Sequence, residues 1–458
     1  MKREFEQFDV RVFDHRRSEE RRFRAGQHFR LDYQSISRYL RVPLTDRMVD
    51  LLRIASTVYF VDRAVRRDRS GRGDGWTRHI TSSIEVQDIG FWKRPETREL
   101  LEQTVGFVSG DRWSFEFSAG TAMHNPCCQR LKLADTPPLV CLYSGGLDSA
   151  AGLAYRLSTG VDRPVVPVVV RHRTDIAKTA IKQLNLIEDH FGTTLFPVTA
   201  MMSTVRPRRL GAEESSQRAR SFLFLGVGGV VAWATDSDGV ELYESGVGAI
   251  NVPLLAGMEG SQATRSCHPT FLRNMARLLT LAAERQIEVR LPFLGLTKGE
   301  IVQGLRMAGL QRLASSTVSC VNYPLRHMRD RGWKVCGVCP ACVFRRLALH
   351  AGGIDESPEN YDIDLLSPLS DRMGPKKLRY LKAFLLLVDQ LDELEEDRMP
   401  IVLARHLRET DVLGSEMTLQ SCLDLYSRYR REWLAFLERA RSNGCRWSNL
   451  IDLPAKAA

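Results

Sequence analysis

The chain has 458 residues, of which 43% are hydrophobic and 26% are charged. This composition is ordinary for a soluble globular protein, excludes a disordered or fibrous chain, and predicts about two to four domains. Lysine and arginine outnumber aspartate and glutamate by 65 to 55, and the resulting net charge of +10 is a mild bias for this length. It permits an anionic ligand such as a nucleotide, and we expect no nucleic-acid partner.

The chain opens with charged residues where a secretory signal would be apolar, and its longest apolar stretch, residues 222–235, has 14 residues. A helix that crosses a membrane needs about 20. We therefore expect a cytoplasmic protein with no membrane partner. In that reducing compartment, clustered cysteines indicate a metal more often than disulfides.

Residues 1–135 mix short apolar runs with basic segments, and we interpret them as an N-terminal α+β extension that could bind a partner. Residues 1–100 contain 22 basic and 16 acidic side chains, so they supply +6 of the excess charge. The arginine-rich stretch at 63–78 contains three glycines and predicts a mobile loop, with phosphate binding as the less favoured interpretation. An Asp-Thr-Pro-Pro sequence at 135–138 marks a boundary.

Strand and helix signals alternate from residue 136 to residue 318. Strands are predicted at 139–143, 165–170, 194–198, 240–244 and 287–290, and helices at 150–157, 175–191, 215–234, 269–285 and 297–308. This alternation predicts a doubly wound parallel sheet covered by helices on both faces. Ligands of such sheets bind beyond the carboxyl ends of the strands.

The rest of the chain divides into two further regions. Residues 319–352 hold a cluster of cysteines, and residues 353–458 are interpreted as a C-terminal helical region. Within the latter, residues 377–394 and 419–440 have apolar side chains at helical spacing, and no strand is predicted after residue 371.

The most specific motif is Ser-Gly-Gly-Leu-Asp-Ser at 144–149, directly between the first predicted strand and the helix after it. Two glycines allow a tight turn and a close approach to a ligand, and the loop amides with the helix N-terminus form a cradle for an anion. Ser144 and Ser149 add hydroxyl donors. Naked phosphate would repel Asp148, so this carboxylate indicates a Mg²⁺ ion between itself and the phosphate oxygens. The alternative is a plain strand-to-helix turn with a polar cap.

This motif resembles the PP-loop of the ATP pyrophosphatase family, whose members cleave ATP between the α and β phosphates and adenylate a substrate. Other nucleotide motifs are weaker. The chain has no G-x-x-x-x-G-K-[ST] sequence, and the glycines at 226–229 lie inside an apolar helix pattern that indicates close packing. The glycines at 246 and 248 lack the third glycine of a dinucleotide fingerprint.

Four cysteines form the second motif. Cys336, Cys339 and Cys342 have Cys-x2-Cys-x2-Cys spacing, and Cys320 lies sixteen residues upstream. Four thiolates suit a closed tetrahedral Zn²⁺ site, in which the ion replaces the hydrophobic core that a short segment cannot build. An iron–sulfur cluster also accepts four cysteines and stays open as an alternative. Incidental buried cysteines and redox chemistry are less favoured.

The two motifs together resemble the 7-cyano-7-deazaguanine synthase (QueC) family of zinc-containing PP-loop enzymes, over about residues 138–352. Further segments are similar to that family, at 219–224 (ARSFLF), 291–301 (LPFLGLTKGEI), 319–320 (Ser-Cys) and 345–346 (two arginines). The sequence departs from that family at two places. Residues 321–335 form a longer insertion between Cys320 and the other three cysteines. In the region near the substrate, Ser-Cys-His-Pro at 266–269 replaces the family's Tyr-Pro-Asp-Cys. The added N- and C-terminal regions most resemble the long QueC-like proteins of Qat-type antiviral operons.

The resemblance implies ATP, Mg²⁺ and Zn²⁺ as cofactors and a ligase-type reaction through an acyl-adenylate. A deazaguanine-type carboxylate would attack the α phosphate of ATP, and an amine would then displace AMP. The pyrophosphate cradle is assigned to Ser144, Gly145, Gly146, Leu147 and Ser149, the Mg²⁺ contact to Asp148, the phosphate cations to Arg220 and Lys298, and the zinc ligands to Cys320, Cys336, Cys339 and Cys342. The two cations could instead be a helix-face salt bridge and a surface lysine.

The identity of the amine stays open at this point. Ammonia would lead toward a nitrile, as in the synthase, whereas a protein amine would give a conjugate with a protein partner from the same operon; we favour the protein amine for this long form. A PP-loop subunit that binds nucleotide without turnover is another alternative. A tRNA-thiolating enzyme with Cys127 or Cys128 as its thiol is the least favoured.

Overall fold

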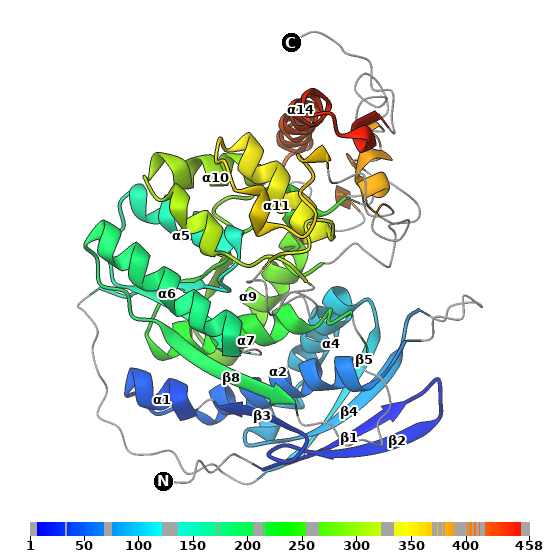
Figure 1. Cartoon of the computed structure of the whole chain (residues 1–458). Helices are drawn as coiled ribbons and strands as arrows, with labels where there is room; N and C mark the ends of the chain where they lie inside the picture. The colour runs from blue at the N-terminus through cyan, green and yellow to red at the C-terminus, as the bar shows by residue number, and fades with distance from the viewer. Residues whose placement is uncertain are drawn as a thin grey trace.

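The computed structural model describes residues 7–32, 34–67, 76–120, 136–171, 174–204, 214, 216–252, 265–321, 334–368 and 417–449, with single positions and short runs between 373 and 412. Structural statements below concern these residues. Figure 1 shows a molecule built around one central sheet, with a second sheet from the N-terminal part of the chain below it.

The central sheet has six strands in the order β10-β9-β6-β7-β8-β3. Five of them pair in parallel, and β3 lies antiparallel to β8 at one edge. The strands are β3 (Phe29–Asp32), β6 (Leu139–Leu142), β7 (Val165–Arg171), β8 (Val198–Thr204), β9 (Gly239–Glu241) and β10 (Glu288–Arg290). The predicted parallel α/β sheet is therefore confirmed, with one antiparallel strand that the sequence did not indicate.

Alternate residues of β6 face two different hydrophobic cores. Leu139 and Cys141 pack with one group of helices, whereas Val140 packs with the other group on the opposite face. The first face carries α5 (Leu147–Ser158), α6 (Thr174–Phe191) and α10 (Lys298–Met307), and the second carries α7 (Arg220–Ala234) and α9 (Pro269–Ala283). Because both faces are covered, the central strands β6 (LVCL) and β7 (VVPVVVR) are almost continuously apolar.

The glycines of α7 let this helix approach three neighbours. A Cβ at Gly226 would lie 2.9 Å from the Cβ of Ala55, and a Cβ at Gly229 would lie 2.4 Å from the side chain of Leu279 on α9. A Cβ at Gly228 would lie 2.7 Å from Leu142 of the sheet. The predicted close packing of this helix is confirmed.

The N-terminal part forms a second sheet in the order β2-β1-β4-β5, in which only β4 and β5 are parallel. Its elements are β1 (Asp9–Asp14), β2 (Glu19–Arg24), α1 (Gln34–Leu40), α2 (Asp46–Ala64), β4 (His79–Val86), α3 (Ile89–Trp92), α4 (Pro95–Ser109) and β5 (Arg112–Ala119). Its apolar side chains belong to the same continuous core as those of α7 and α9. The domain division at residue 135 stays a prediction, although β3, from before that position, lies in the central sheet.

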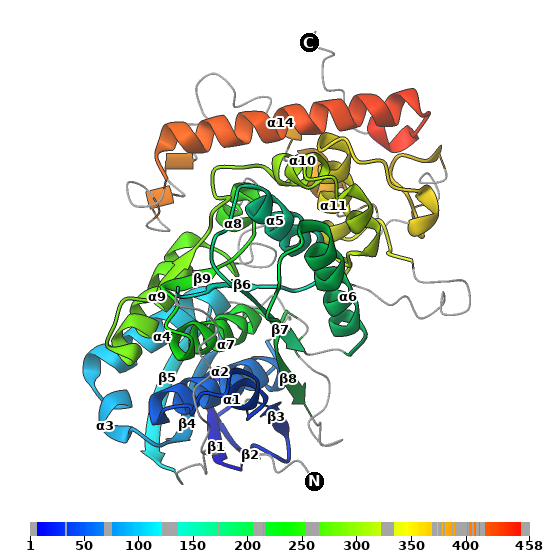
Figure 2. The same cartoon turned by 90° about the vertical axis from the view of Figure 1, so that its left-hand side faces the viewer.

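A third core lies at the other end of the molecule. It contains the four cysteines, α8 (Gly246–Ile250), α11 (Pro340–Ala351) and α14 (Leu419–Ser442). Figure 2 shows α14 lying across α10 and α11. The short helices η3 (Gln311–Ser316), η5 (Pro358–Asn360) and η7 (Arg446–Asn449) complete the described elements. At 377–394, the described positions 378, 381–386, 388 and 389 are helical, as predicted.

Several predicted bounds were wrong. The helix predicted from residue 215 begins at Arg220, because Gln217 has a left-handed φ of 45° that interrupts a helix. The strand predicted at 194–198 was wrong at both ends: β8 spans Val198–Thr204, directly after Pro197, a residue without an amide hydrogen to donate. The strand predicted to end at residue 244 ends at Glu241, and Ser245 then caps α8.

Candidate functional site

The glycine loop joins the carboxyl end of β6 to the first turn of α5. Gly145 has a φ of +77°, and a Cβ there would lie 3.1 Å from the Cβ of Ala180 on α6, so conformation and space both require glycine. Gly146 is the N-cap residue of α5. The first-turn amides and the positive end of the helix dipole therefore lie at the carboxyl edge of the sheet, where an anion would be stabilised.

Two hydroxyl groups lie within this loop. The Oγ atoms of Ser144 and Ser149 are 3.2 Å apart. The Gly146 amide donates to Ser144 Oγ over 3.2 Å, and Ser149 Oγ donates to the Gly146 carbonyl over 3.0 Å. The structure thus brings the predicted loop residues together, while their contacts with a nucleotide stay predictions.

Asp148 and Lys298 form an ion pair beside the loop. The Lys298 Nζ atom lies 3.0 Å from each carboxylate oxygen of Asp148. Lys298 is the first residue of α10, whose N-terminus is fixed by a capping box between Thr297 and Glu300. Burial lowers the pKa of Lys298, but the charges of Asp148 and Glu244 outweigh that effect, so its pKa is raised and the ammonium is retained.

Glu244 is a site residue that the sequence reasoning missed. Its Oε1 atom lies 3.9 Å from Lys298 Nζ and accepts a hydrogen bond of 3.0 Å from the Ser245 amide. Burial and the neighbouring charge of Asp148 raise the pKa of Glu244 to about 7. Its place just beyond β9, at the carboxyl edge of the sheet, was the signal that could have found it.

Arg220 lies apart from this group of charges. It begins α7, its side chain is exposed, and its guanidinium carbon lies 5.8 Å from the centre of the Phe224 ring. Surrounding protein atoms nevertheless desolvate the guanidinium enough to lower its pKa. Among the described residues no salt bridge to Arg220 is found, and both interpretations of Arg220 stay predictions.

The thiol of Cys267 is close enough to feel the charge of Arg220 as well as the charges of Asp148, Lys298 and Glu244. It lies in the Ser-Cys-His-Pro segment before α9 and is partly buried. Burial raises the pKa of its thiol, the carboxylates of Glu244 and Asp148 raise it further, and the cations Lys298 and Arg220 act in the opposite direction. Arg220 begins α7, which follows the carboxyl end of β8 and ends shortly before β9 begins, so it lies at the same edge of the sheet as Lys298, without a described contact between them.

The segment that precedes the cysteines contacts the glycine loop. The Val318 amide donates to the Gly145 carbonyl over 3.1 Å, and the Leu147 amide donates to Ser319 Oγ over 3.2 Å. Ser319 is the second residue that the sequence reasoning missed as part of the site. The signals were its position directly before Cys320 and the similarity of the Ser-Cys pair at 319–320 to the family.

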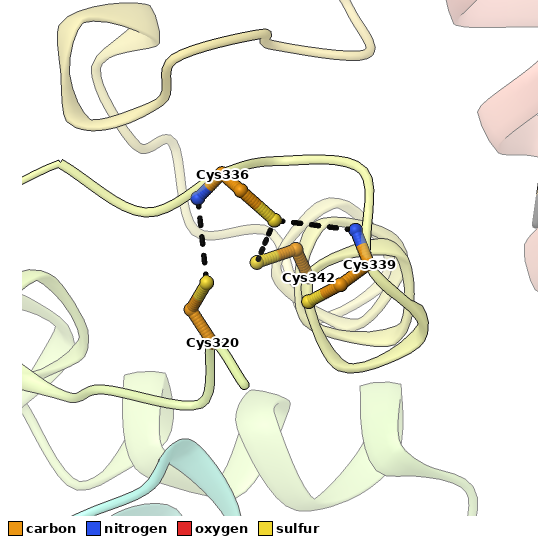
Figure 3. Close-up of side chains that lie close together, drawn as sticks. All are labelled: Cys320, Cys336, Cys339 and Cys342. Atoms are coloured by element: carbon orange, nitrogen blue, oxygen red, sulfur yellow. Dashed lines mark hydrogen bonds between the residues drawn. The ribbon is translucent and has the colours of Figure 1, made fainter. Parts of the chain in front are cut away.

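The four predicted cysteines come together in the third core (Figure 3). All four are buried, and their sulfur atoms lie within 4.8 Å of one another. A tetrahedral Zn²⁺ ion with bonds of about 2.3 Å separates its ligand sulfurs by about 3.8 Å, and Cys336 Sγ lies 3.8 Å from Cys342 Sγ. The Cys339 amide donates to Cys336 Sγ over 3.3 Å. The four side chains therefore fit a closed zinc site.

Two arginines after the cluster have structural partners. Arg345 forms a buried ion pair with Glu356 over 2.5 Å, and Arg346 pairs with Asp364 over 2.7 Å. Both carboxylates follow α11, so the pairs hold the chain after this helix against it. Each arginine is neutralised by its carboxylate partner, so neither guanidinium is available to bind a phosphate.

Several predicted features lie outside the described residues. They are Cys127 and Cys128, the three glycines of the arginine-rich stretch, and most of the insertion at 321–335. Among the described helices, none is long and apolar enough to cross a membrane.

Comparison with known proteins finds similarity to one family, and the similar region covers about half of the chain. Residues 247–353, which include Lys298 and the four cysteines, match the family described as queuosine biosynthesis protein QueC. The 7-cyano-7-deazaguanine synthase of Aromatoleum aromaticum is 26% identical over an alignment of 234 residues, which covers 47% of this chain and 95% of that enzyme. The synthases of Cupriavidus taiwanensis and Cellvibrio japonicus are each 25% identical, over 49% and 48% of this chain and 98% and 96% of their own lengths.

The predicted similarity to QueC is therefore confirmed over about half of the chain. Because the synthases are covered almost completely, the other half of this chain has no counterpart in them.

Proposed function

We propose that this protein uses ATP to adenylate the carboxylate of a deazaguanine-type small molecule and then joins the acyl group to an amine. The observation that carries the proposal is the Asp148–Lys298 pair beside a glycine loop at a helix N-terminus. This arrangement supplies amides, an ammonium and a carboxylate to a polyphosphate and its metal ion. The similarity to 7-cyano-7-deazaguanine synthases supports the class of substrate.

The first step forms one bond and breaks one. A carboxylate oxygen of the substrate attacks the α phosphorus of ATP, the bond between the α phosphorus and the bridging oxygen to the β phosphate breaks, and pyrophosphate leaves. The loop residues 144–149 bind the departing pyrophosphate, and Lys298 and Arg220 neutralise its charge. Asp148 holds Mg²⁺, which when bound neutralises phosphate charge. The chain contributes mainly position and electrostatic stabilisation.

The second step transfers the acyl group. The amine nitrogen attacks the acyl carbon, the bond to AMP breaks, and one proton leaves the amine as the amide forms. A carboxylate alone is a poor acylating agent, whereas AMP is a good leaving group, which explains why ATP is consumed.

We assign the amine to a protein partner encoded in the same operon, as in Qat-type antiviral systems. Support comes from the half of the chain that has no counterpart in the synthases. Ammonia is the second candidate, because the relatives are named for a cyano product. A subunit that binds nucleotide without turnover is the third candidate; the intact Asp148 argues against it, since sites that have lost their activity usually lose such residues.

The test is to incubate the full-length protein with ATP, Mg²⁺ and 7-carboxy-7-deazaguanine, and to follow AMP release by chromatography. Parallel reactions contain ammonium, the operon partner, or neither, and mass spectrometry follows the mass of each acceptor. An added mass on the partner supports the protein amine, and a nitrile or amide of the small molecule supports ammonia. Absence of AMP in every reaction would overturn the adenylation proposal.

Asp148→Ala is the matched loss-of-function variant, and Asp189→Ala is its control, since Asp189 is an exposed carboxylate on α6. We expect the first variant to lose AMP release and the second to retain it. Full biological activity of the Asp148→Ala variant would favour the non-catalytic subunit.

A further inference from the structure

The segment from Ala314 to Cys320 lies between the glycine loop and the cysteine cluster. It includes the end of η3 and the residues that lead to the first cysteine. Hydrogen bonds hold this segment on both sides. One set joins it to the glycine loop, and the other joins it to the cysteine cluster.

On the side of the glycine loop, three residues join the segment to the loop. The Val318 amide donates to the Gly145 carbonyl, and the Leu147 amide donates to Ser319 Oγ. Gln183 of α6 adds a bridge, because its Nε2 atom donates to the carbonyls of both Gly145, over 3.3 Å, and Ser316, over 2.7 Å. The conformation of the loop therefore depends on where this segment lies.

On the side of the cysteine cluster, the chain continues directly from Ser319 to Cys320. The Cys336 amide donates to Cys320 Sγ over 3.4 Å. Arg345, on the helix that carries Cys342, donates to Thr317 Oγ1 and, over 2.7 Å, to the Ala314 carbonyl. The position of Ser319 is thus fixed by the same elements that form the four-sulfur site.

We propose that Ser319 is a positioning residue that couples the four-cysteine metal site to the phosphate-binding loop, so that metal occupancy and nucleotide binding strengthen each other. The proposal rests on the proposed function for its nucleotide. With the metal bound, Cys320 is held, Ser319 Oγ accepts from the Leu147 amide, and the first turn of α5 has its phosphate-binding conformation. Without the metal, Cys320 and the Ser319 hydroxyl are released together.

The hydroxyl group is suited to this role. A serine hydroxyl has one proton to donate and lone pairs to accept with. The Leu147 amide uses Ser319 Oγ as its acceptor, so removal of the hydroxyl removes the side-chain link between this segment and the loop.

Coupling between two binding sites is reciprocal: if metal raises the affinity for ATP by some factor, ATP raises the affinity for metal by the same factor. One hydrogen bond of this kind corresponds to a factor of about 2 to 10. The coupling can therefore be measured from the metal side, without any turnover.

The experiment measures how Zn²⁺ is shared at equilibrium between the zinc-loaded full-length protein and a colorimetric chelator, with and without α,β-methylene-ATP and Mg²⁺. A reaction with free Zn²⁺ corrects for metal binding by the nucleotide itself. The variants are Ser319→Ala, the conservative Ser319→Thr, and Ser315→Ala as a control. Ser315 is exposed in the same helix η3, and its hydroxyl bonds only the Arg312 carbonyl among the described residues.

We expect the nucleotide to raise the equilibrium affinity for Zn²⁺ about 2- to 10-fold in the unmodified protein, in Ser319→Thr and in Ser315→Ala, and to have no effect in Ser319→Ala. Nucleotide binding is measured in parallel by calorimetry. Binding without an effect on zinc affinity, or an unchanged effect in Ser319→Ala, would overturn the coupling and leave the proposed function intact. Absence of nucleotide binding by the unmodified protein would overturn both.

Discussion

The Nζ atom of Lys298 lies 3.0 Å from a carboxylate oxygen of Asp148, although 150 residues separate them along the chain. The contact joins the first turns of α5 and α10, which pack side by side on the same face of the central sheet. Two helix N-termini therefore meet with one ammonium and one carboxylate at the edge where ligands of parallel sheets bind. A polyphosphate placed there would compete with Asp148 for Lys298.

Replacement of Lys298 by methionine, which keeps the length of the side chain and removes its charge, tests that competition. We expect AMP release from ATP to fall about 100-fold, because loss of one charged donor from a phosphate-transfer site typically has that effect. Lys182→Met, an exposed lysine on α6, is the control and should keep the full rate. Equal rates in both variants would show that Lys298 does not act on the nucleotide.

Gly145→Ala tests the shape of the loop. The φ of +77° would cost the alanine about 1 kcal/mol, and its Cβ would lie 3.1 Å from Ala180. Gly160 has a similar φ of +85°, but a Cβ at that position would have no atom within 4 Å, so Gly160→Ala is a matched control for backbone strain alone. We expect calorimetry to find ATP binding lost in Gly145→Ala and retained in Gly160→Ala. Retention in both would argue against the loop as the phosphate site.

The central sheet was predictable because buried parallel strands and amphipathic helices have clear and different periodicities. The strand β3 was not, because the four residues Phe29–Asp32 are too short for a pattern and pair with β8 from far along the chain. Sequence spacing also identified the four cysteines, since metal ligands of one site must lie close together.

The charges around the loop were only partly predictable. Asp148 lies inside a recognisable motif, whereas the contacts of Glu244 with Lys298 and of Ser319 with the Leu147 amide join segments that are far apart in the sequence. Glu244 was interpreted as the last residue of a strand. It lies beyond the strand because β9 ends at Glu241 and the chain then turns into α8.

Loss of one cysteine should remove the metal. Cys342→Ser leaves three thiols for a site that fits four, and we expect zinc content measured by atomic absorption to fall well below one ion per chain, together with the melting temperature. Cys422→Ser is the control, since Cys422 is buried in the same third core but does not belong to the cluster. We expect the Cys422→Ser variant to have a lower melting temperature and to keep its zinc content. An iron signal in the unmodified protein would instead identify the cluster as an iron–sulfur site.

The contribution of Glu432 to the stability of the protein should fall as pH rises from about 5 to 7. This residue of α14 accepts a hydrogen bond from Thr297, the N-cap of α10, and burial raises its pKa to about 7. The folded protein then binds a proton that the unfolded chain has already lost, so unfolding is favoured as pH increases between the two pKa values. A shift of this size corresponds to at most about 3 kcal/mol.

The Glu432→Gln variant removes this titration while it keeps the shape of the side chain. We expect the dependence of its unfolding free energy on pH, measured by urea denaturation between pH 5 and 7, to be weaker than that of the unmodified protein. Glu244 has a raised pKa as well and remains in both proteins, so the difference between the slopes isolates Glu432. Identical slopes would contradict the prediction.

The N-terminal part should be required for the fold of the rest. Asp62 at the end of α2 accepts a hydrogen bond of 3.0 Å from the Ala219 amide, directly before α7, and forms a buried ion pair with Arg78 over 2.5 Å. Removal of residues 1–135 would expose the face of α7 that packs on α2 and leave that amide without its acceptor. We expect residues 136–458 alone to aggregate or to bind a hydrophobic dye, while Asp62→Ala in the full chain loses about 3–5 kcal/mol. A soluble fragment with a cooperative melting transition would show that the chain divides into independent domains at residue 135.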